Sequence, residues 1–170
     1  MNKFLVVIDM QNDFITGTLG SAQAQAVVEP VKRCIEDALN KGYNIVFTMD
    51  THGEDYLLTD EGKRLPIIHC QKGTEGWQIH KDLLDYAKVK FEKPQFSSME
   101  LIELLKNSSV DEVELVGLCT DVCVITNAMM IKSVLPECRV CVRESCCAGI
   151  TDEGHRTALN AMAACHIDII

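Results

Sequence analysis

The sequence predicts a single doubly wound α/β domain over residues 1–170, with a six-stranded parallel sheet and helices on both faces. Short apolar runs alternate with longer amphipathic segments along the whole chain, which is the pattern of a parallel sheet built from βαβ units. The runs are nearly continuous in apolar residues, as expected for strands buried on both faces. No internal repeat, low-complexity tract or linker divides the chain.

The expected strands are residues 3–9, 43–49, 87–92, 112–118, 138–143 and 166–170, and the expected helices are residues 25–41, 98–106, 121–135 and 152–165. Pro30 suits the opening turn of the first helix, where its missing N–H is not needed. Gly42 suits the end of that helix. Asp152 suits the start of the last helix, because negative charge is favourable near a helix N-terminus.

The composition excludes several classes of protein. Hydrophobic residues make up 47% of the 170 residues, which is too many for a disordered chain. A net charge of −9 disfavours binding to nucleic acid or to an anionic membrane. No apolar run reaches the length of a membrane span, and the start does not resemble a signal peptide, so we expect a cytoplasmic protein.

The nine cysteines do not indicate a disulfide framework. Their number is odd, and several lie in apolar runs, which favours buried free thiols in a reducing compartment. Cys146 and Cys147 are adjacent and receive no assigned role.

Polar residues follow four of the expected strands. Asp9, Asp50 and Lys93 each lie at or just after a strand end, and Cys119 and Cys123 follow the fourth strand. Because sites in open parallel sheets form at the carboxyl ends of the strands, these residues are expected to converge at one edge.

Cys123 is the first candidate nucleophile. It follows a strand and a turn and falls in the first turn of an expected helix, where Thr120 and Asp121 are suitable N-capping residues. Unpaired N–H groups and the helix dipole there favour a thiolate and can bind an oxyanion. The alternatives are a buried core thiol, or a redox or metal pair of Cys119 with Cys123, although that spacing differs from the two-residue gap of redox motifs.

Asp50, His52 and His69 offer oxygen and nitrogen donors suited to zinc, manganese or iron. His52 and His69 lie in the irregular stretch 51–76, and loops of that length in a compact domain are commonly functional. The alternative is that they are ordinary polar loop residues.

Four segments resemble one known family. The run Gly-Leu-Cys-Thr-Asp-Val-Cys-Val at 117–124 is similar to the nucleophile motif of the isochorismatase-like cysteine hydrolases, which include nicotinamidases. The opening strand 5–14, the segment 91–96, and Asp50-Thr-His52 with His69-Cys70 also resemble that family and occur in its order. The likeness runs from residue 3 to beyond residue 155.

The resemblance implies the strand order 3-2-1-4-5-6 and a catalytic set of Asp9, Lys93 and Cys123. It further implies an oxyanion hole formed by the backbone N–H groups of Cys119 and Cys123, with a cis peptide bond between Leu118 and Cys119.

The resemblance also implies one divalent metal ion beside the catalytic set. Its ligands would be Asp50, His52 and His69, with Glu61 as the fourth, and zinc is expected ahead of manganese or iron.

The substrate pocket implied by the resemblance contains Phe14 and Phe96 as aromatic walls. Leu65 stands near the place where many nicotinamidases carry another aromatic residue, which weakens the expectation for nicotinamide itself.

The expected function is that of a metal-assisted cysteine amidohydrolase of the nicotinamidase type, acting on a small-molecule amide, in a homo-oligomer. One alternative is a family member acting on a ureido or carbamoyl substrate, although those branches generally lack the metal ligands. A vinyl ether hydrolase is a further alternative, but that chemistry does not use a thiol such as Cys123. The last is a non-catalytic metal-binding protein on the same scaffold.

Overall fold

The computed structural model describes residues 1–170, which form one six-stranded sheet in the order β3-β2-β1-β4-β5-β6. All neighbouring strands are parallel. The strands are β1 (Lys3–Ile8), β2 (Asn44–Asp50), β3 (Lys90–Lys93), β4 (Glu112–Leu118), β5 (Arg139–Ala148) and β6 (Asp168–Ile169). The predicted fold class and strand order are therefore confirmed.

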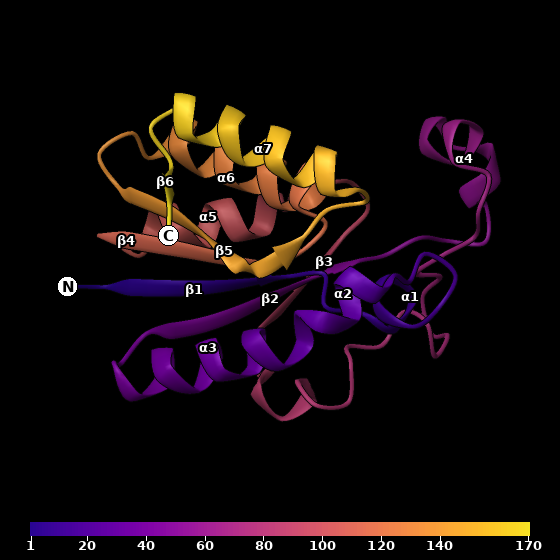
Figure 1. Ribbon diagram of the computed structural model, residues 1–170, viewed down its shortest axis with the longest axis horizontal. Helices are drawn as coiled ribbons and strands as arrows, with labels where there is room; N and C mark the ends of the chain where they lie inside the picture. The colour runs from indigo at the N-terminus through magenta and orange to yellow at the C-terminus, as the bar shows by residue number, and fades with distance from the viewer.

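Helices cover both faces of the sheet (Figure 1). One face carries α2 (Ala22–Ala26) and α3 (Val28–Asn40), and the other carries α5 (Met99–Asn107), α6 (Ile125–Val134) and α7 (Asp152–Ala164). No helix has the length and apolar character needed to cross a membrane.

The central strand β1 contributes to two separate cores. Val6 and Ile8 pack in the core beneath α5, α6 and α7, whereas Leu5 and Val7 pack in the core beneath α3. All four side chains are fully buried. Successive side chains of a strand point to opposite faces, so a strand that is apolar at every position requires cover on both sides.

The structure contains short helices that the sequence patterns did not predict. These are α1 (Asn12–Ile15), α2 and α4 (Asp60–Arg64), together with 3-10 turns at Tyr56–Leu58 and Leu84–Tyr86. Helices of four or five residues are too short to show a hydrophobic period. Side-chain caps fix two of them: Ser21 Oγ accepts a hydrogen bond from Ala24 N, and Thr59 Oγ1 accepts one from Gly62 N.

The start of the helix after β4 also differs from the prediction. Residues Thr120–Val124 form a π-helical turn that leads into α6, and Cys119 occupies the N-cap without a side-chain cap. The expected capping role of Thr120 and Asp121 was therefore wrong. The carboxylate of Asp121 instead accepts hydrogen bonds from the backbone N–H of Ile150.

At the amino end of β4, Glu112 forms a polar cluster at the edge of the core. Glu112 accepts hydrogen bonds from Tyr43 Oη at 2.5 Å, Arg139 Nη1 at 2.8 Å and Lys3 Nζ at 3.3 Å. Burial alone would raise the pKa of Glu112, but these three donors outweigh it and lower the pKa to about 2.

We predict that Glu112→Gln lowers the free energy of unfolding by about 1–3 kcal/mol at pH 7, because a charge-assisted set of hydrogen bonds is lost. A carboxylate with a lowered pKa stabilises the fold above its usual value of 4.5, and that contribution disappears as the pH falls toward 2. Urea unfolding of wild type and variant should therefore converge between these pH values. A difference that stays constant over that range would contradict the role of this charge.

Candidate functional site

Three side chains from the ends of three strands meet in a buried cluster. Lys93 Nζ lies 2.7 Å from Asp9 Oδ2 and 3.4 Å from Cys123 Sγ, and none of the three residues is more than 5% exposed. The residues come from the ends of β1 and β3 and from the turn after β4, so the parallel sheet brings them together. The expectation that these three residues converge at one edge therefore agrees with the geometry.

Asp9 is held in place on both sides. Thr48 Oγ1 donates a hydrogen bond of 2.6 Å to Asp9 Oδ1, while Asp9 Oδ2 pairs with Lys93. The backbone of Asp9 adopts a left-handed φ of 46°, which is uncommon outside glycine and occurs frequently at functional sites. Burial raises the pKa of Asp9, although the Lys93 ammonium opposes that shift.

Lys93 remains charged despite its burial. Burial alone would lower the pKa of Lys93, but Asp9, Cys123 and Asp50 together raise it above its usual value. Asp50 Oδ1 lies 3.4 Å from Lys93 Nζ and supplies a second carboxylate. The ammonium group is thus the cation that permits two carboxylates to share this buried space.

At Cys123, burial opposes the thiolate that a helix terminus and the Lys93 cation favour. Burial and the nearby Asp9 carboxylate raise the pKa of the Cys123 thiol well above its usual value, and Lys93 lowers it by less. The one hydrogen bond to the sulfur comes from Lys93 Nζ, at 3.4 Å. The physical reason is complete burial, which penalises the charged form more than the cation stabilises it.

Four potential metal ligands lie next to this cluster. The donor atoms of Asp50, His52, Glu61 and His69 all lie within 4.8 Å of one another. His69 Nε2 is 3.5 Å from Asp50 Oδ2 and 3.8 Å from Glu61 Oε1, and His52 Nε2 is 3.8 Å from the same Glu61 oxygen. Ligands of a tetrahedral ion with bonds of about 2.1 Å lie about 3.4 Å apart, so the spacing suits a small divalent ion.

The orientation of the two histidines also suits an ion. His69 Nδ1 is hydrogen-bonded to the carbonyl of Ile67 at 2.8 Å, which leaves Nε2 directed toward the carboxylates. His52 Nε2 is buried and makes no aligned hydrogen bond, although Asp50 Oδ2 lies 2.9 Å away. A buried nitrogen without an aligned partner is rare in folded proteins, and a metal ion would satisfy it.

Both groups open into one cavity of about 940 Å³. The expected pocket residues Phe14, Leu65 and Phe96 line this cavity, and Cys119 lines it as well. The peptide bond between Leu118 and Cys119 is cis, as the resemblance implied.

Three residues contribute to the site without having been predicted. Gln11 locks the ends of two strands, because its Nε2 donates to Asp50 O at 2.8 Å and its Oε1 accepts from Asp50 N at 2.7 Å. Tyr56 packs against the rings of His52 and His69, at centroid distances of 4.5 and 5.1 Å. Thr48 orients Asp9. The sequence offered one signal for two of them, which is a polar residue next to apolar strand residues. Thr48 lies within β2, and Gln11 lies shortly after β1.

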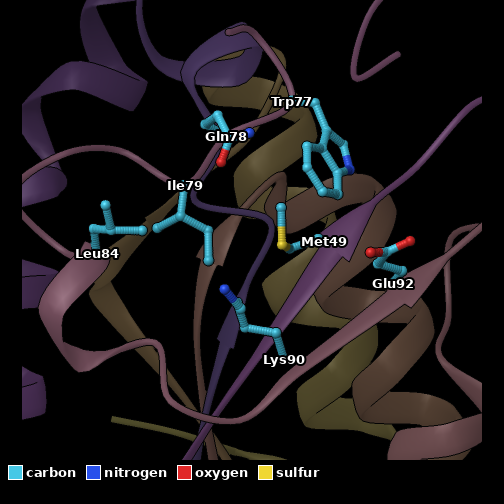
Figure 2. A pocket seen from close by; sticks show the side chains of 7 residues that line it. All are labelled: Met49, Trp77, Gln78, Ile79, Leu84, Lys90 and Glu92. Atoms are coloured by element: carbon cyan, nitrogen blue, oxygen red, sulfur yellow. The ribbon is translucent and has the colours of Figure 1, made fainter. Parts of the chain in front are cut away.

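Trp77 does not line the large cavity. It lines a separate space of about 160 Å³ on the other side of β2, together with Met49, Leu84, Lys90 and Glu92 (Figure 2). Trp77 Nε1 donates a hydrogen bond of 2.9 Å to Thr51 Oγ1, so the indole anchors the backbone that follows Asp50.

The fold and the site together define an α/β protein with a cysteine-centred polar site at the carboxyl edge of its sheet. The isochorismatase domain matches residues 3–170, and the chain belongs to the isochorismatase family.

Three known proteins are similar to this chain over nearly its whole length. An uncharacterized isochorismatase family protein PncA of Bacillus subtilis is 29% identical over 96% of this chain and 95% of its own length. A pyrazinamidase/nicotinamidase structure from Streptococcus mutans is 29% identical, with a TM-score of 0.90 over 99% of this chain and 100% of its own. A pyrazinamidase of Pyrococcus horikoshii in complex with zinc is 27% identical, with a TM-score of 0.87 over 100% and 99%.

We predict that Lys93→Gln lowers the free energy of unfolding by about 3–5 kcal/mol, because it leaves the buried carboxylates without their cation. The double variant Asp9→Asn with Lys93→Gln should recover part of that loss, since one uncompensated charge is removed as well. Urea unfolding of the two single variants and the double variant measures the coupling. Strictly additive losses would show that the two side chains do not interact.

We predict that the protein binds one equivalent of zinc after dialysis against the ion, and that His52→Ala weakens the binding at least about 100-fold because a ligand is removed. Glu61→Gln should weaken it by a smaller factor, since the amide oxygen remains as a neutral donor. Glu54→Gln, at an exposed position of the same loop, is the matched control. Isothermal titration and elemental analysis measure both quantities, and affinity unchanged by His52→Ala would place the ion elsewhere.

Proposed function

We propose that this protein is a metal-dependent cysteine amidohydrolase that converts nicotinamide and water to nicotinate and ammonia. The observation that carries the proposal is the buried contact of Lys93 with Asp9 and Cys123, directly beside oxygen and nitrogen donors in one cavity. The two solved relatives described above, which are named for pyrazinamidase or nicotinamidase activity, support the same function. We propose that residues 1–170 form one hydrolase domain and that the protein is a cytoplasmic homo-oligomer.

The first step is attack by Cys123 Sγ on the carboxamide carbon. The thiol proton passes to Asp9, whose pKa is raised by burial and whose Oδ2 makes no hydrogen bond besides its ion pair with Lys93. Lys93 keeps its charge throughout and stabilises the developing negative charge on sulfur and carboxylate. The N–H groups of Cys119 and Cys123 bind the oxyanion of the tetrahedral intermediate.

The second step releases ammonia. Asp9 returns the proton to the leaving nitrogen as the C–N bond breaks, and a thioester to Cys123 remains. Water then attacks the thioester carbon and gives one proton to Asp9. The C–S bond breaks, nicotinic acid leaves and gives its acidic proton to the released ammonia, so that nicotinate and ammonium result, and the proton on Asp9 returns to the Cys123 sulfur. Atoms and protons balance over the cycle.

The metal ligands in this proposal are Asp50, His52, Glu61 and His69, with zinc as the resident ion. When bound, such an ion supplies a Lewis acid that can hold a ring nitrogen of the substrate at a fixed place. Asp50 connects the two halves of the site, because one of its oxygens faces Lys93 and the other faces both histidines.

The walls of the cavity suit a flat aromatic amide. Phe14 lines the cavity, and its ring lies 5.6 Å from that of His69 in a tilted, edge-type arrangement. Phe96 is 42% exposed and has apolar surface available for a ligand. Leu65 supplies an aliphatic wall where relatives place an aromatic one.

A second candidate is hydrolysis of a different small amide, such as a carbamoyl compound. It is favoured by the cavity volume of about 940 Å³, which exceeds the needs of a ligand with nine heavy atoms, and by Leu65. A non-catalytic metal-binding protein is disfavoured, because a buried ion cluster is costly and contributes nothing to holding a metal.

We predict that the zinc-loaded protein releases ammonia from nicotinamide and that Cys123→Ala lowers the turnover number by at least about 1,000-fold, because the nucleophile is removed. A coupled ammonia assay measures both. The exposed Cys165→Ala variant is the matched control and should retain wild-type turnover. Turnover of a carbamoyl amide with none of nicotinamide would move the protein to the second candidate, and turnover by Cys123→Ala would remove the thiol mechanism.

A further inference from the structure

The turn Thr120–Val124, which carries Cys123, is hydrogen-bonded to the segment 149–155 at the start of α7. The hydroxyl oxygen Thr120 Oγ1 lies 2.8 Å from His155 Nδ1 in a hydrogen bond, and Thr120 is fully buried. One residue further, Asp121 accepts from the backbone N–H of Ile150, at 3.0 and 3.2 Å to its two oxygens.

The two segments approach each other closely at Gly154. A Cβ atom added to Gly154 would lie 2.2 Å from Asp121 Oδ2 and 3.2 Å from Asp121 Cγ. A side chain there would displace the Asp121 carboxylate that accepts the hydrogen bonds of Ile150 N. The start of α7 therefore fits tightly against the turn, and small shifts of one must move the other.

Within the turn, most hydrogen bonds are internal. Cys119 O accepts from Val122 N and from Val124 N, both at 3.1 Å, and these bonds shape the turn without fixing its place in the protein. The side chains of Thr120 and Asp121 are its two polar ties to the segment 149–155. Thr120 directly follows Cys119, so its bond to His155 acts on the backbone next to the Cys119 peptide group.

We propose that His155 is a positioning residue, which acts through the Thr120 hydroxyl to hold the Cys119 N–H and the Cys123 sulfur in their reactive arrangement. His155 does not line the large cavity, so it has no direct contact with a substrate there. This inference rests on the proposed hydrolase function for its catalytic consequence, but its structural consequence can be measured without any substrate.

The reason for a catalytic effect is geometric. A displacement of about 1 Å between nucleophile and carbonyl can reduce the rate about 100-fold, even when the substrate binds equally well. Loss of the His155 contact should therefore lower kcat and leave KM nearly unchanged. A histidine with only a structural role would affect stability without lowering kcat selectively relative to KM.

The test uses full-length zinc-loaded protein, five single variants and one double variant. His155→Ala removes the contact, while His155→Asn keeps a polar group near the place of Nδ1. Thr120→Val removes the hydroxyl at nearly constant shape, and Thr120→Ser keeps it. Arg156→Ala, at an exposed position next to His155 on the same helix, is the matched control.

Two quantities are measured for each variant. The first is the rate of Cys123 alkylation by iodoacetamide relative to that of exposed Cys165, obtained from peptide masses. The second is kcat and KM for nicotinamide. His155→Ala and Thr120→Val should each raise the relative labelling of Cys123 at least fivefold, because the loosened turn exposes a thiol that is now 5% exposed. Both should lower kcat at least about 10-fold, with KM changed less than threefold.

His155→Asn, Thr120→Ser and Arg156→Ala should stay within threefold of wild type in both quantities. Combining His155→Ala with Thr120→Val should add little to either single loss. The inference is overturned if labelling and kcat are unchanged in His155→Ala and Thr120→Val, if KM alone rises, or if Arg156→Ala has the same effect. If the wild type fails to hydrolyse nicotinamide, the proposed function fails, whereas the labelling ratios still decide the role of His155.

Discussion

The buried ammonium group of Lys93 is the interaction on which the site depends. It lies between Asp9 and Asp50, and without a cation two carboxylates could not remain ionised at that depth. Lys93 also contacts the thiol of Cys123 directly, and Asp50 in turn contacts the two histidines. One lysine thus links the proton-transfer half of the site to the metal-binding half.

The fold provides this arrangement because every strand delivers its last residue to the same edge. Asp50 and Lys93 are register partners on β2 and β3, so their side chains are neighbours by strand pairing alone. Gln11 then ties the segment after β1 to the end of β2. The stretch after β2 contributes Glu61, from α4, and the two histidines, whose rings pack against Tyr56. The catalytic half is therefore carried mainly by the sheet and the metal-binding half mainly by the long loop.

The sequence predicted the strands and the convergence of polar residues well, because buried parallel strands and their end residues leave a clear apolar pattern. It predicted β5 only to residue 143, whereas the strand continues to Ala148 across a register shift opposite β4. Glu144 and Ser145 interrupt the apolar run there, which hid the continuation. The contact of His155 with Thr120 was also beyond sequence patterns, since it joins side chains 35 positions apart on a close approach that depends on tertiary packing.

The pairing of β1 with β4 determines when the cysteine thiols become shielded from solvent. Its register joins Lys3 with Glu112, so the centre of the sheet closes only after more than one hundred residues are available. Once it has closed, Cys165 is the one cysteine classed as exposed, and six of the nine are buried. Before closure every thiol meets solvent. The cysteines that end up inside the core are therefore open to oxidants chiefly during synthesis and refolding, and the closed sheet shields them afterwards.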